Sequence, residues 1–207
     1  MRKQLSTILF FGAIWGLLEA TLGYLLHFLP VLISGSIMFP IAALLLMVAY
    51  KKMGSPWMLI YIGIVAAVIK SVNFLMPGLL PIKTYNPMIA IMIQSVVMVG
   101  VAYISEKKSL SGTLVALGLS SFLWRGVFLI NNVINHQLTG FNFPQFASLN
   151  ATIEFMFFYG SLGAIFGIFI YIGWIILSKK ISINWRPHVA LSLGLTIVAL
   201  LATYFIH

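Results

Sequence analysis

Four ionisable side chains lie inside long apolar segments, where they could pair with each other or bind a charged ligand. They are Glu19, Lys70, Arg125 and Glu154, and Lys70 is typical, because it lies in the apolar run GIVAAVIKSVNFLMPG. An ionised side chain that faces lipid costs at least about 2.5 kcal/mol, so such groups turn inward, pair or line a wet cavity. Lys70 and Arg125 could also receive the carboxylate or phosphate of a ligand, since both donate hydrogen bonds from a positive charge.

The segments that hold these residues are those of a membrane protein. The chain has 207 residues, of which 61% are apolar and 7% charged, and its mean hydropathy is +1.08. Because about 20 helical residues cross the hydrocarbon core, seven segments are candidate spans. They are residues 6–29, 32–50, 57–76, 87–105, 110–133, 148–178 and 187–206. We therefore predict an all-α, polytopic membrane helix bundle of six to seven helices, formed as one integral membrane domain over residues 1–207.

The basic residues predict how this bundle is oriented. If seven spans alternate, one side receives Arg2, Lys3, Lys51, Lys52, Lys107, Lys108, Lys179, Lys180 and Arg186, and the other receives Lys83. Cytoplasmic loops collect such charge, so we predict that the N-terminus is inside and the C-terminus outside. The net charge of +9 is then a topology signal and does not indicate a nucleic-acid partner. We expect a multi-pass protein of the cell (plasma) membrane.

With this orientation, the polar residues of the spans gather toward the outer side. At about 1.5 Å per helical residue, Lys70, Gln94 and Glu154 lie about 10 Å below the outer surface, with Glu19 and Arg125 deeper. Two arrangements fit this distribution. Glu19 could pair with Arg125 and Lys70 with Glu154, which would lock the bundle, or the group could line a polar cavity open to the outside.

We predict that such a cavity would bind a small molecule. The predicted substrate-binding residues are Lys70, Asn73, Gln94, Arg125, Asn132, Glu154, Glu19, Tyr85, Asn86 and Asn135. The outer loops at residues 77–87 and 134–148 would close over the ligand, with their prolines and glycines as hinges. Their aromatic and amide side chains suit a flat, hydrogen-bonding molecule.

Two surfaces of small residues could mediate close helix packing. Gly12, Gly16 and Ala20 are four residues apart on the first span, and we call them the glycine stripe. Gly160, Gly163, Ala164 and Gly167 form a second such surface on the sixth span. Small residues at this spacing allow another helix to approach closely. The glycine stripe could therefore bind a partner subunit, or it could pack inside the bundle.

The sequence excludes several chemistries and leaves two alternatives to transport. It contains no cysteine and no aspartate, and its four histidines show no metal-ligand spacing, so we predict no metal and no cofactor. It has no P-loop, so any coupling to ATP must come from partner ATPases. One alternative is an enzyme acting on a lipid or polyprenyl phosphate, with Glu154 or Glu19 as general base and Lys70 or Arg125 holding the phosphate. Another is a structural subunit that uses only the small-residue surfaces.

The layout as a whole resembles the substrate-binding S components of energy-coupling factor (ECF) transporters, which take up vitamins in prokaryotes. Those proteins are of similar size and bind ligand in the outer half, under extracellular loops. Their first helix carries a small-residue motif, usually of alanines, that contacts a transmembrane coupling subunit, and Gly12, Gly16 and Ala20 would stand in for it here. The family typically has six helices. The resemblance implies a membrane-embedded binding subunit for a small, vitamin-like nutrient, coupled to partner ATPases, and not an enzyme.

Overall fold

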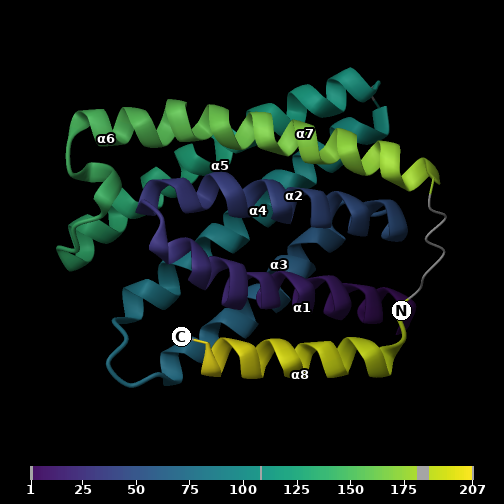
Figure 1. The fold of residues 1–207 in the computed structure, drawn as a ribbon, viewed down its shortest axis with the longest axis horizontal. Helices are drawn as coiled ribbons and strands as arrows, with labels where there is room; N and C mark the ends of the chain where they lie inside the picture. Colours follow the sequence, from purple (N-terminus) through teal and green to yellow (C-terminus); the bar gives the residue numbers. More distant parts are fainter. Residues whose placement is uncertain (1, 108, 181–186, 207) are drawn as a thin grey trace.

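The computed structural model describes residues 2–107, 109–180 and 187–206, and this part of the chain contains helices and no strand (Figure 1). The α-helices are α1 (Arg2–Leu25), α2 (Ser34–Met53), α3 (Met58–Lys70), α4 (Pro81–Lys107), α5 (Leu110–Thr139), α6 (Leu149–Ile153), α7 (Tyr159–Lys180) and α8 (Val189–Phe205). Short 3₁₀ turns are η1 (Leu26–Phe28), η2 (Val31–Ile33), η3 (Ser71–Leu75) and η4 (Pro144–Phe146). A π-helical segment, η5 (Glu154–Phe158), joins α6 to α7.

Six segments of the described chain are long and apolar enough to cross a membrane. They are Gln4–Leu25, Ser34–Met53, Met58–Leu75, Pro81–Lys107, Leu110–Thr139 and Leu149–Lys180. The helix α8 is apolar but shorter, at 17 residues. The predicted polytopic helix bundle of six to seven helices is therefore confirmed, whereas its orientation in a membrane stays a prediction.

Two predicted loops are shorter in the structure than in the sequence prediction. The helix α4 begins at Pro81, six residues before the predicted start of its span, and it includes Pro87. Proline suits the first helical position, where its missing N–H has no partner within the helix in any case. The helix α5 continues to Thr139 and ends at Gly140, whose φ of 67° favours glycine. The amides Asn132 and Asn135 are therefore helical.

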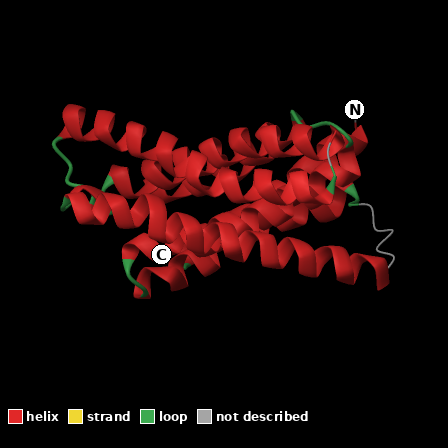
Figure 2. Cartoon of the chain, turned by 90° about the horizontal axis from the view of Figure 1, so that it is seen from above, coloured by secondary structure: helices red, strands yellow, loops and turns green. Residues whose placement is uncertain are grey.

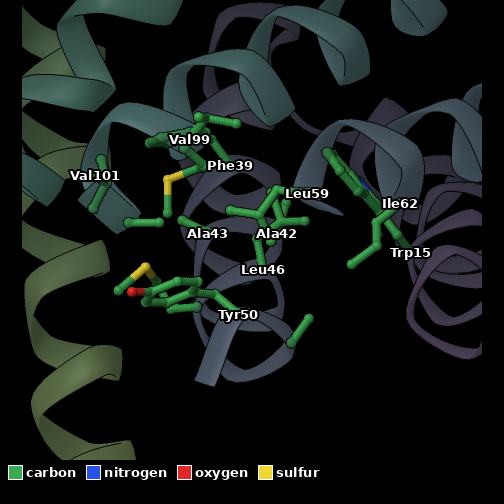
Figure 3. Packing of buried hydrophobic residues seen from close by; sticks show 14 of the residues in the cluster. Trp15, Phe39, Ala42, Ala43, Leu46, Tyr50, Leu59, Ile62, Val99 and Val101 are labelled. Carbon is green, nitrogen blue, oxygen red and sulfur yellow. The ribbon is translucent and has the colours of Figure 1, made fainter. Parts of the chain in front are cut away.

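The helices run side by side along the long axis, with their connections at the two ends (Figure 2). The helix α1 packs against α3 and α8, and α3 packs against α4, which in turn packs against α5. The helix α7 packs against α2 and α5. Buried side chains from α1 to α5, together with η5 and α7, form the apolar core. Figure 3 shows part of it, including Trp15, Phe39, Leu46, Leu59 and Val99.

The glycine stripe lies inside the bundle. A Cβ atom added to Gly12 would lie 2.5 Å from the Cβ of Val65, and one added to Gly16 would lie 2.8 Å from Cγ2 of Ile69. Ala20, the third member, is fully buried. The structure therefore shows internal packing against α3, the alternative that the sequence left open, and these residues offer no free surface to a partner.

The second small-residue surface is also internal. A Cβ atom on Gly160 would lie 2.8 Å from the ring of Phe122 on α5, and one on Gly163 would lie 2.8 Å from Oγ of Ser121. These contacts bring α7 close to α5, next to the site described below.

Candidate functional site

A cavity of about 480 Å³ lies at the end of the bundle where α1 and α3 finish and α2 and α4 begin. This is the end that the basic residues predict to face outside. Its lining comes from α1, η2, α2, α3, α4, α5, the segment of residues 141–145 and the π segment η5. Because so many elements contribute, the cavity is formed by the tertiary fold and not by any one loop.

Four of the ten predicted substrate-binding residues line this cavity. Glu19 comes from α1, Lys70 from the end of α3, and Asn86 and Gln94 from α4. Lys70 and Gln94 are buried, and Glu19 and Asn86 are partly buried. The structure thus brings together polar side chains that are up to 75 residues apart in the sequence, from Glu19 to Gln94.

The other six predicted residues are not part of the lining. Arg125 lies behind it, as described below. Asn73, Asn132 and Asn135 are buried elsewhere, whereas Tyr85 and Glu154 are exposed. Glu154 begins the π segment, which changes the helical register that its predicted inward direction assumed.

Glu19 and Lys70 act on each other electrostatically, and each is the main charged neighbour of the other. Trp15 also donates a hydrogen bond from Nε1 to the Glu19 carboxylate, at 3.3 Å. The predicted pairs, Glu19 with Arg125 and Lys70 with Glu154, are both wrong. The reason is that α1 packs on α3, whereas Arg125 on α5 faces α2 and α7.

Arg125 is fully buried and holds three helices together through two serine hydroxyls. Its Nη1 donates to the carbonyl oxygen of Ser121 at 2.8 Å and to the Ser121 hydroxyl at 2.9 Å, and its Nη2 donates to the Ser36 hydroxyl at 2.9 Å. Those hydroxyls donate in turn to the first turn of α7, Ser36 to the Tyr159 carbonyl at 2.8 Å and Ser121 to the Gly160 carbonyl at 2.9 Å. The network therefore joins α2, α5 and α7 directly after the π segment.

Removing either hydroxyl should destabilise the bundle. We expect Ser36→Ala and Ser121→Ala each to lower the free energy of unfolding by about 1–3 kcal/mol, because each leaves a buried N–H of Arg125 without that acceptor. Thermal unfolding in detergent measures this. Ser178→Ala is the matched control, since Ser178 is exposed and bonds only within its own helix, to the Ile175 carbonyl. Equal unfolding temperatures for all three variants would contradict the role of the network.

Aromatic side chains form one wall of the cavity. The rings of Trp124, Phe128 and Phe155 pack together, with centroids 5.8 to 6.4 Å apart. Phe143 is buried in the same lining, and Gln145, two residues later, accepts a hydrogen bond on its carbonyl from Thr152, at 2.7 Å. None of these five residues was among the predicted site residues. Aromatic residues are common in membrane segments, and the aromatic residues named here are distinguished only because they line the same cavity.

Several buried polar atoms of the lining have no hydrogen-bond partner. They are the side-chain oxygens of Asn86 and Gln94 and the indole N–H of Trp124. A buried polar atom without a partner costs about 1–3 kcal/mol, so its presence in a folded protein needs a reason. A ligand that donates to the two oxygens and accepts from the indole would supply it.

Comparison with protein-family models, with curated proteins and with solved structures finds no match to this chain. Among the described residues, no group of three His, Cys, Asp or Glu side chains could hold a metal ion. The cavity itself is therefore the feature that indicates a function.

Proposed function

We propose that this protein is a membrane-embedded binding subunit that captures a small, vitamin-like nutrient for uptake across the cell membrane. The observation that carries the proposal is the cavity of about 480 Å³, with charged, amide and aromatic side chains on its walls. Ligand sites typically enclose about 300–1,000 Å³, with mostly apolar walls and a few polar groups that fix the ligand. This cavity has that composition.

Its position supports capture from outside. The predicted orientation places the cavity in the outer half of the bundle, beneath the segment of residues 141–145. The S components of ECF transporters, which the sequence resembles, bind ligand in the same half. That resemblance implies a transmembrane coupling subunit and ATPases as partners. Since the glycine stripe is internal, such partners would contact other surfaces of the bundle.

The proposal predicts that the purified protein retains a small molecule through Gln94. We expect Gln94→Leu to retain at least about tenfold less of it than the unchanged protein, because the amide contact is lost at similar side-chain volume. Mass spectrometry of the molecules released on denaturation measures the retained amount. Gln4→Leu, at an exposed position on α1, is the matched control and should retain as much as the unchanged protein.

Isolation from the native membrane tests the coupling to transport. We expect an ATPase and a second membrane protein to be isolated together with this chain. Metal-dependent turnover of a lipid phosphate by the chain alone would contradict a transport role and favour the enzyme alternative. If Gln94→Leu retained the molecule at full occupancy, the cavity would not be its binding site.

A further inference from the structure

Arg125 is a buried cation for which the described part of the chain supplies no counter-charge. The sequence has three acidic side chains, Glu19, Glu106 and Glu154. Glu19 acts on Lys70, Glu106 interacts with Tyr50 at the other end of the bundle, and Glu154 is exposed. The hydrogen bonds of Arg125 to Ser121 and Ser36 go to neutral oxygens, and its Nε has no hydrogen-bond partner.

The cavity reaches the surroundings of this guanidinium. The guanidinium carbon lies 4.7 Å from the ring centroid of Trp124 and 5.6 Å from that of Phe155, and both rings line the cavity. Gly35 also lines it, and a Cβ atom there would lie 3.8 Å from Nη2 of Arg125 and 2.9 Å from the Trp124 ring. The absence of a side chain at Gly35 therefore lets the cavity come close to the charge.

The balance of charge around the cavity is positive. The lining holds one carboxylate, Glu19, and two ammonium groups, Lys70 and the exposed Lys83, with Arg125 behind the aromatic wall. A buried charge without a partner costs several kcal/mol, and away from water charges interact strongly. An anion in the cavity would relieve this cost, whereas a cation would increase it.

We propose that the ligand is a small organic anion with a flat aromatic part, an inference that rests on the proposed binding function. The ring lies against Trp124 and Phe155, and the anionic group lies near Gly35, where the free indole N–H of Trp124 donates to it. A ring N–H of the ligand donates to the unpartnered oxygens of Asn86 and Gln94. The Arg125 cation that already lies against the aromatic wall disfavours an amine of the same shape.

Three indole compounds that differ in charge test this proposal: indole-3-acetate, indole-3-acetamide and tryptamine. All three carry the ring N–H, and only the first is an anion. Equilibrium dialysis against the purified full-length protein in detergent gives their dissociation constants. We expect indole-3-acetate to bind at least about tenfold more tightly than the other two, since a charge-assisted contact is roughly twice as strong as a neutral one and the amine is repelled.

Variants then locate the preference for the anion. Arg125→Gln should reduce the preference for the acid over the amide to less than about threefold, as the buried charge is removed. Trp124→Phe keeps the ring and loses the N–H, so it should weaken the acid by about tenfold and the amide less. This second variant keeps the test decisive if Arg125→Gln does not fold. Lys179→Gln, exposed at the far end of α7, is the control.

Each outcome decides the question. Equal or tighter binding of the amide or of tryptamine overturns the inference, as does the absence of binding by all three compounds. Inorganic phosphate that displaces indole-3-acetate at the same concentration also overturns it, since an inorganic anion would then be sufficient. If tryptamine binds best and Gln94→Leu removes its binding, the binding function stands and only the anion preference fails. If the acid binds best but no partner subunit is isolated and no uptake is found, the anion preference stands and the role in transport fails.

Discussion

Replacing Lys70 by methionine is expected to abolish ligand binding at the cavity. Lys70 is the buried ammonium group of the lining, and it balances the Glu19 carboxylate beside it. Methionine is similar in length but removes the positive charge that would attract an anionic ligand, and it leaves Glu19 as an unbalanced negative charge. Since removing one partner of a buried pair costs about 3–5 kcal/mol, the variant should also unfold at a lower temperature.

A double variant separates these two effects. Glu19→Gln with Lys70→Met removes both charges, so we expect it to recover most of the lost stability and none of the binding. Lys180→Met, at the exposed end of α7, is the control and should match the unchanged protein in both measurements. Retention of the co-purified molecule and thermal unfolding are the two readouts. Recovery of full binding in the double variant would show that the two charges serve only to hold α1 against α3.

Replacing Gly12 or Gly16 by leucine should have the second large effect, on folding. A Cβ atom at either position would lie within 2.9 Å of Val65 or Ile69 on α3, before the rest of the leucine side chain is added. Overpacking of this kind costs about 1–3 kcal/mol or more, and the two helices cannot approach as closely without the glycines. We expect each variant to give less than about a fifth of the normal yield of monodisperse protein in detergent, because the folded state of a typical domain is stable by only 5–15 kcal/mol.

Glycines in open positions give the matched controls. Gly100 on α4 and Gly173 on α7 have no heavy atom within 4 Å of an added Cβ. Gly100→Leu and Gly173→Leu should therefore leave the yield and the elution profile unchanged. If Gly12→Leu and Gly16→Leu instead gave a normal yield and lost only uptake, the glycine stripe would contact a partner after all.

The sequence predicted the helical framework because length and hydropathy alone decide whether a segment can span a bilayer. It did not predict the helix ends with the same accuracy. Pro81 can begin a helix as well as interrupt one, so the start of α4 was placed six residues late. The asparagines near the end of α5 favour loops by composition, yet tertiary packing keeps them helical.

Within the site, depth along each helix could be predicted, but the neighbours of each side chain could not. Lys70 and Gln94 were predicted at comparable depths, with Glu19 deeper and Asn86 in an outer loop, and all four line the same cavity. The partner of Glu19 depended on which helix packs against α1, and a single sequence does not contain that information. The acceptors of Arg125 are serines, whose hydroxyls could equally have bonded within their own helices.

The π segment Glu154–Phe158 makes the site depend on the number of residues in the chain as well as on their types. Each residue turns an α-helix by about 100°, so loss of one residue here would let the helix become regular and rotate everything before it by that angle. Phe155 would then leave the wall that it forms with Trp124 and Phe128. An alignment of related chains that allowed a gap at this point would superimpose the helices correctly and still misplace the ring of Phe155.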